Sequence, residues 1–143
     1  MFRMPISLTT VLIFMLALPA LSLAWGYQYI SAADVKQKVE SQAPMTLVDI
    51  QVEKEFKQHN IVGAVATYAY PVKSSADQAK MKAAINSLKQ NEDLAVVVCP
   101  RGGGGAKRAY KLLRESGIAE ERLAILTDGQ AAWPYPELLT QNQ

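Results

Sequence analysis

The most constraining feature of the sequence is the order of residues around its single cysteine. Cys99 follows a valine-rich run, Leu94–Val98, and precedes a proline, an arginine and four consecutive glycines. The valine-rich run predicts a central parallel strand, buried on both faces, and the pattern of Ala106–Ser116 predicts a helix. In open α/β sheets, ligands bind just beyond the carboxyl ends of the strands. This order therefore places Cys99 at a candidate ligand site.

The loop after Cys99 is suited to a negative charge. A helix N-terminus presents unpaired N–H groups and the positive end of the helix dipole, and a glycine-rich backbone curls so that its N–H groups converge on one anion. Both effects favour the thiolate form of a cysteine. An inert cysteine, packed as a small hydrophobic residue, is the alternative. The order of strand, cysteine, glycines and helix favours the reactive thiol.

The candidate site residues follow from this interpretation of Cys99 as a reactive thiol. Cys99 is the candidate nucleophile, and Asp49, near a strand end, either orients the loop or caps the next helix. Lys107 and Arg108 are expected in a first helical turn, where the helix dipole disfavours cations, and this hints that they attract anions to the site. Pro100 has no N–H and contributes only rigidity. The candidate substrate-binding residues are Pro100, Arg101, Gly102, Gly103, Gly104 and Gly105.

Other glycine-loop and cysteine motifs fit less well. A nucleotide-binding P-loop requires Ser or Thr after its lysine, but Arg108 follows Lys107. A dinucleotide-binding fingerprint starting at Gly102 requires a third glycine at position 107, and that residue is lysine. A cysteine phosphatase requires an arginine six positions after the cysteine, and that residue is Gly105. With one cysteine and one histidine, a zinc site is not expected.

The rest of the chain alternates predicted strands with predicted helices. This alternation predicts an α/β fold, in which a mostly parallel sheet is covered by helices on both faces. No repeat or second domain is evident, so one domain is expected over residues 25–143. Further strands are predicted at Met45–Ile50 and Leu123–Leu126, and further helices at Ser31–Ser41, Val52–Gln58 and Ser74–Gln90.

Residues 1–24 have the layout of a secretory signal peptide. A positive charge at Arg3 precedes an apolar run, Leu8–Leu18, and small residues at Ser22 and Ala24 fit a cleavage site. We therefore expect the domain to be exported, to the periplasm. An uncleaved membrane anchor is the alternative, because residues 6–25 carry no charge and are just long enough to span a bilayer. Contact with a membrane is expected only in that case.

Composition limits the partners of the domain. A single cysteine permits no internal disulfide, although exported domains often contain them. The formal net charge is +2 and the basic residues are spread along helical stretches, so nucleic acid is not an expected partner. The oligomeric state is left open by the sequence.

Several segments together resemble the rhodanese (sulfurtransferase) family. Leu47–Ile50 is similar to the family's early strand with its aspartate, and Ile61–Ala64 to the stretch that leads to the second strand. Cys99–Gly104 resembles the six-residue active loop, with Gly102 at its recurrent glycine. Asp128–Trp133 resembles the closing turn and tryptophan. The match runs from about Tyr29 to Pro134, and the order and spacing of the segments make it specific.

The resemblance implies a three-layer domain and a persulfide mechanism. Cys99 would take sulfane sulfur from an anionic donor, such as thiosulfate or polysulfide, or from a protein persulfide. It would then pass this sulfur to a thiophilic acceptor. Backbone N–H groups from Arg101 to Gly104 would stabilise the bound persulfide and the leaving anion. No metal or organic cofactor is implied.

Departures from the family pattern keep two other functions open. Gln51 and Asn60 stand where many members have arginine and histidine, and Gly104 stands where the loop often has Arg or Ser. His59 is expected at the surface or behind the site rather than as a general base. A carrier or sensor of sulfane sulfur without turnover is one alternative function, and an inactive rhodanese-like interaction module is the other.

Overall fold

The computed structural model describes residues 26–141. The predicted signal peptide, residues 1–24, and the first predicted residue of the domain lie outside the described residues. Among residues 26–141, no helix has both the length and the apolar character needed to cross a bilayer.

A five-stranded parallel sheet forms the centre of the described chain. Its strand order is β1-β5-β4-β2-β3, which places β4 in the middle. β4 pairs with β2 along all five residues, from Met45 opposite Leu94 to Asp49 opposite Val98, and with β5 on its other side. Cys99 therefore leaves the sheet at its centre. The strands are β1 Tyr29–Ile30, β2 Met45–Asp49, β3 Val65–Ala66, β4 Leu94–Val98 and β5 Leu123–Leu126.

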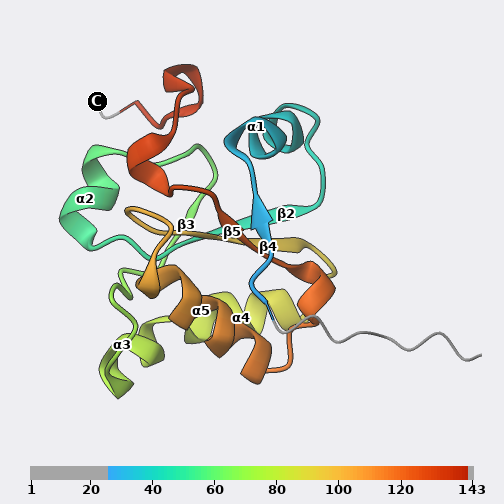
Figure 1. Ribbon diagram of the computed structural model, residues 1–143, viewed down its shortest axis with the longest axis vertical. Helices are drawn as coiled ribbons and strands as arrows, with labels where there is room; N and C mark the ends of the chain where they lie inside the picture. The colour runs from blue at the N-terminus through green and yellow to red at the C-terminus, as the bar shows by residue number, and fades with distance from the viewer. Residues whose placement is uncertain (1–25, 142–143) are drawn as a thin grey trace, which may run out of the picture.

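Helices cover both faces of the sheet, as the alternating sequence pattern predicts (Figure 1). Helix α1 lies on one face together with the C-terminal segment, and α3, α4 and α5 lie on the other, while α2 follows the carboxyl end of β2. Three short 3-10 helices complete the chain. The bounds are α1 Ala32–Glu40, α2 Glu53–Gln58, α3 Ser75–Lys80, α4 Lys82–Lys89, α5 Gly104–Glu115, η1 Glu120–Arg122, η2 Gln130–Ala132 and η3 Pro136–Leu138.

The core has two parts, separated by the sheet. Side chains of a strand alternate between its faces. Ala95, Val97 and Cys99 accordingly pack with the α4 and α5 side chains, and Val96 and Val98 pack with Val35 of α1. All of these residues are at most 2 % exposed, so β4 is buried on both faces, as its run of valines predicts.

The predicted helix over Ser74–Gln90 is broken at Met81, and this prediction was wrong. Ser74 caps α3 with a reciprocal capping box to Asp77, but the N–H of Met81 bonds to the carbonyl of Gln78, three residues back. This tighter bond interrupts the helical ladder, and α4 then starts at Lys82. The apolar spacing continues through the break because Met81 itself is fully buried.

Helix α5 starts two residues earlier than the predicted Ala106. The turn out of β4 is completed by Gly102, whose φ is +68°, and Gly103 is the N-cap residue. Gly104 and Gly105 are therefore free to adopt helical backbone. As a result, Lys107 ends the first turn of α5 and Arg108 begins the second, farther from the helix end than the sequence suggested.

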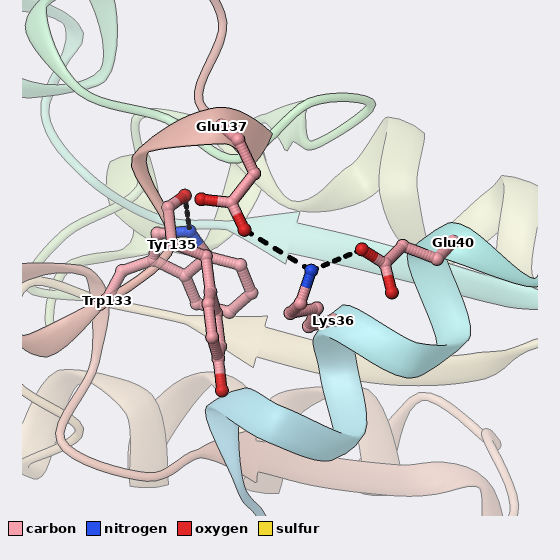
Figure 2. A network of polar contacts seen from close by, with 5 residues as sticks. All are labelled: Lys36, Glu40, Trp133, Tyr135 and Glu137. Atoms are coloured by element: carbon pink, nitrogen blue, oxygen red, sulfur yellow. Dashed lines mark hydrogen bonds and ion pairs between the residues drawn. The ribbon is translucent and has the colours of Figure 1, made fainter.

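A set of polar contacts ties the C-terminal segment to α1 (Figure 2). The ammonium of Lys36 pairs with Glu40 and with Glu137, at 3.2 Å from the latter, and lies 5.2 Å from the ring centre of Tyr135. The indole N–H of Trp133 donates to the carbonyl of Tyr135 at 2.9 Å. Trp133 is 7 % exposed and packs in the core beneath α1.

Candidate functional site at the cysteine loop

Cys99 lies at the carboxyl end of β4 and is held by the loop that follows it. Its residue exposure is 2 %. The backbone N–H of Gly102 donates to Cys99 Sγ at 2.8 Å. A side chain at Gly102 would be strained by the positive φ, and its β-carbon would lie 3.0 Å from the amide nitrogen of Asp128. Glycine at this position therefore allows the loop to direct an N–H group at the sulfur.

The loop after β5 braces the cysteine loop from behind. The N–H of Gln130 donates to the carbonyl of Cys99 at 2.8 Å, and the N–H of Ala131 donates to the carbonyl of Pro100 at 3.0 Å. Directly before these two residues, Gly129 adopts a φ of +67°. A β-carbon on Gly129 would come within 2.6 Å of the amide nitrogens of Arg101 and Gly102 and would collide with the carbonyl oxygen of Cys99. The two loops thus fit together only with glycine at 129.

A cavity of about 180 Å³ opens at Cys99. One wall is Tyr70, whose ring lies so close to α5 that a β-carbon on Gly105 would be 2.8 Å from it. No side chain caps the N-terminus of α5. Its first N–H groups have no acceptor inside the helix, and they add positive potential near the cavity. The cavity is lined by Tyr70, Cys99, Pro100, Arg101, Gly103, Gly104 and Gly105.

The candidate substrate-binding residues divide into two roles in the structure. Pro100, Arg101 and the glycines at 103–105 line the cavity, whereas Gly102 bonds to the sulfur. Of the N–H groups expected around the sulfur, that of Gly102 is the one that donates to Sγ in the described chain. Arg101 is exposed, so its guanidinium is open to solvent and to a ligand in the cavity.

Lys107 and Arg108 do not line the cavity. The Lys107 ammonium lies 5.4 Å from the ring centre of Tyr27, away from the cysteine loop. Arg108 Nε donates to the carbonyl of Pro71 at 2.8 Å, and the guanidinium lies beside Gly104. Lys107 and Arg108, for which we expected the same role, therefore lie in different surroundings.

Asp49 is fully buried and interacts with Gln51 rather than with the cysteine loop. Its carboxylate accepts the backbone N–H of Gln51 at 2.9 Å and the side-chain Nε2 of Gln51 at 3.0 Å. Burial raises the pKa of Asp49 from its ordinary value of 3.8 to about 6, and the two hydrogen bonds oppose this rise. The N-cap of α2 is Val52, so Asp49 does not cap that helix. In the described chain, Asp49 therefore neither hydrogen-bonds to the cysteine loop nor caps α2, which were its two expected roles.

A second cavity, of about 220 Å³, lies on the other side of Pro100 and Arg101. His59 Nδ1 lies 2.8 Å from Gln130 Nε2 there, and Gln130 is 1 % exposed. His59 is thus linked to Cys99 through Gln130, behind the site. The lining residues are Gln51, Glu55, Gln58, His59, Pro100, Arg101, Gln130 and Ala131.

Sequence reasoning missed the bracing residues. The segment Asp128–Trp133 resembles the family's closing turn, but nothing local in it indicates that this turn packs against the cysteine loop. Of the two tyrosines just before Pro71, Tyr70 lines the cavity. Tyr68 instead contacts Phe56, at 5.9 Å between ring centres.

The arrangement provides one nucleophile in an anion-favouring cavity. Cys99 Sγ is the candidate nucleophile, the Gly102 N–H and the start of α5 favour negative charge, and the exposed Arg101 lines the same cavity. Among residues 26–141, no cluster of three or more His, Cys, Asp and Glu side chains is arranged to hold a metal ion.

Comparison with known proteins identifies the family. Residues 31–134 match the model of the rhodanese-like domain. No curated protein matches the chain.

Solved structures share the fold at low sequence identity. A rhodanese-like domain protein from Staphylococcus aureus is 22 % identical, with a TM-score of 0.59 over 78 % of this chain and 95 % of that one. A rhodanese-related protein from Thermoplasma volcanium is 17 % identical, with a TM-score of 0.59 over 80 % of this chain and 98 % of that one. An As-Sb reductase from Leishmania major is 14 % identical, with a TM-score of 0.63 over 80 % and 85 %.

Proposed function

The chain belongs to the rhodanese-like family, and we propose that it moves sulfane sulfur from an anionic donor to a thiophilic acceptor through a persulfide on Cys99. The observation that carries this proposal is the N–H of Gly102, which donates to Cys99 Sγ at 2.8 Å inside a small cavity. A hydrogen bond from an N–H stabilises a thiolate relative to the thiol. The cysteine is therefore suited to attack rather than to inert packing.

In the first step, the thiolate of Cys99 attacks the outer sulfur of the donor. A new S–S bond forms to Sγ, and the S–S bond inside the donor breaks. The bonding electron pair leaves with the rest of the donor, which is sulfite when the donor is thiosulfate. Arg101 faces the cavity and would stabilise the departing anion, and the N–H groups at the start of α5 would stabilise the terminal sulfur of the persulfide.

In the second step, the acceptor removes the outer sulfur. An acceptor thiolate attacks it, the S–S bond to Sγ breaks, and Cys99 leaves as a thiolate stabilised by the same Gly102 N–H. The cycle needs no external oxidant or reductant, because each step exchanges one S–S bond for another.

A sulfane-sulfur carrier is the second candidate function. Cys99 is only 2 % exposed, and the residue at 104 contributes no side-chain donor to the loop. A buried persulfide would be protected from large acceptors, so it would persist until a suitable acceptor entered the cavity. In this case the protein would store or report sulfane sulfur rather than turn it over.

The test is to incubate the protein with thiosulfate or polysulfide, remove the small molecules, and measure the intact mass. We expect a gain of about 32 Da, one sulfur atom on the nucleophile, in wild type and none in Cys99→Ser. Repeated sulfite release on addition of a small thiol identifies the enzyme, and one equivalent identifies the carrier. No mass gain with either donor would contradict both functions.

We also propose that the domain acts outside the cytoplasm. The support is the charge, apolar run and small-residue site within residues 1–24. Expression of the full chain followed by cell fractionation and N-terminal sequencing tests this. A mature protein that starts near residue 25 in the periplasm is expected, and an unprocessed chain in the cytoplasm would contradict it.

A further inference from the structure

The guanidinium of Arg108 occupies space that a side chain at position 104 would take. A β-carbon on Gly104 would lie 3.1 Å from Nη1, 3.6 Å from Nη2 and 3.7 Å from Cζ of Arg108. Gly104 lines the cavity of Cys99, whereas Arg108 stands behind it, one helical turn along α5. Because Gly104 has no side chain, it leaves the guanidinium close to the edge of the cavity.

Arg108 is fixed in this position by one bond and keeps the rest of its donors unused. Its Nε donates to the carbonyl of Pro71 at 2.8 Å, and Arg108 is half-buried. Neither Nη1 nor Nη2 has a hydrogen bond or an ion pair within residues 26–141. A guanidinium has five donors in a rigid fork, so four remain for a ligand or for water.

The contacts of Arg108 determine where its positive charge lies. Pro71 follows Tyr70, whose ring is the wall of the cavity beside Gly105. The bond to Pro71 therefore holds the charge between the Tyr70 segment and Gly104, and both Tyr70 and Gly104 line the cavity. Arg101, the other cation near Cys99, makes no contact with the described chain that would fix its position.

We propose that Arg108 is a specificity-determining residue that selects a small anion as the donor to Cys99. The inference rests on the proposed function of Cys99 and deepens it, because it names a residue that recognises the charge of the donor. A cation beside the cavity raises the concentration of anions near Cys99 and leaves the concentration of neutral molecules unchanged.

Lys107 offers a matched control. It carries the same charge one residue earlier, but its ammonium lies over the Tyr27 ring, 5.4 Å from the ring centre, whereas the guanidinium of Arg108 lies beside Gly104 of the cavity lining. Removing either charge changes the net charge of the protein equally. A difference between the two variants must therefore come from position.

The experiment compares how fast Cys99 reacts with an anionic and with a neutral alkylating reagent, iodoacetate and iodoacetamide. Cys99 is the only cysteine, so loss of the free thiol reports on this site alone. The ratio of the two rates cancels changes in thiolate fraction and in burial, which affect both reagents alike. At low ionic strength we expect Arg108→Gln to lower the iodoacetate-to-iodoacetamide ratio about threefold, the attraction expected of one nearby charge in a solvated site.

Two further variants and a change in salt concentration test whether the effect depends on the position of the charge or only on the net charge of the protein. We expect Lys107→Gln to have nearly the wild-type iodoacetate-to-iodoacetamide ratio, and Arg108→Lys to keep most of that ratio because the charge stays in place. Added salt should reduce the difference in ratio between wild type and Arg108→Gln. An unchanged ratio in Arg108→Gln, or an equal fall in Lys107→Gln, would overturn the inference. Because alkylation needs no donor or acceptor, the proposed sulfur transfer can fail without affecting this result.

Discussion

A β-carbon on Gly129 would lie 2.6 Å from the amide nitrogen of Gly102, the same amide that donates to Cys99 Sγ. The loop after β5 thus sets the position of the Gly102 N–H group, which donates to the cysteine sulfur. This contact joins two segments that are more than twenty residues apart, and it depends on a residue with no side chain.

Replacing Gly129 by alanine is expected to displace the cysteine loop. The new β-carbon meets backbone atoms, which cannot rotate away, and φ at 129 is +67°. We expect a loss of about 3 kcal/mol or more in the free energy of unfolding, measured by urea denaturation, together with a changed alkylation rate of Cys99. Gly63→Ala is the matched control, since φ there is +79° but no atom lies within 4 Å of the added carbon. It should lose only about 1 kcal/mol; equal losses would refute the proposed clash.

Addition of one carbon at Gly105 is expected to move the wall of the cavity. The β-carbon of Gly105→Ala would lie 2.8 Å from the Tyr70 ring, and because Tyr70 is 40 % exposed, we expect the ring to move toward solvent. We expect a loss of stability of about 1 kcal/mol and slower sulfur loading of Cys99. A double-mutant cycle with Tyr70→Ala measures the coupling, because the added carbon has room once the ring is removed. Additive effects of the two substitutions would show that the ring is not what the new carbon displaces.

Asp49 is expected to make the protein less stable as the pH rises from about 4 to about 6. Its folded pKa, about 6, is above its ordinary value of 3.8 because of burial, so the folded state binds the proton more tightly than the unfolded chain. Stability is therefore highest below the unfolded pKa and is lost as the carboxyl ionises in the folded protein. Between pH 5 and pH 7.5, wild type should lose about 1 kcal/mol relative to Asp49→Asn. Denaturant titrations of both proteins at the two pH values measure this, and parallel pH profiles would contradict it.

The contacts of Lys36 should matter more than those of an ordinary surface lysine. Its ammonium joins α1 to the C-terminal segment through Glu137 and Tyr135 (Figure 2). Within residues 26–141, Lys111 by comparison pairs only with Glu115 of its own helix, at 3.6 Å and with both side chains well exposed. We expect Lys36→Gln to lower the melting temperature at low salt more than Lys111→Gln does, and salt to narrow the gap. The same melting temperature for both variants would exclude a stabilising link between α1 and the C-terminus.

Local signals in the sequence were sufficient for the main elements. Val96–Val98 is apolar on both faces, and β4 and β5 have the bounds that their apolar runs predict, over Leu94–Val98 and Leu123–Leu126. The helix predicted to begin at Ser31 is α1, whose N-cap is Ser31, and this side chain accepts a hydrogen bond from the N–H of Asp34. In these segments, period and capping chemistry agree with the tertiary packing.

Features that depend on distant segments were not predictable in this way. Strand β1 has two residues, too few to produce a period, and exists because Tyr29 and Ile30 pair with β5. Helix α5 starts at Gly104 because Gly102 completes the turn, although a glycine run by itself gives no helix signal. The separate directions of Lys107 and Arg108 depend on Tyr27 and Pro71, which come from remote parts of the chain.

The glycines around Cys99 also determine how this site must be studied by mutation. Alanine scanning finds functional residues by subtracting atoms, but Gly102, Gly104, Gly105 and Gly129 have no side-chain atoms to subtract. In the proposed function, recognition depends on backbone groups and on the space that missing side chains leave open, as for Arg108 beside Gly104. The informative experiment at such positions is addition, one carbon at a time, and each added carbon measures the room that the fold keeps empty for its ligand.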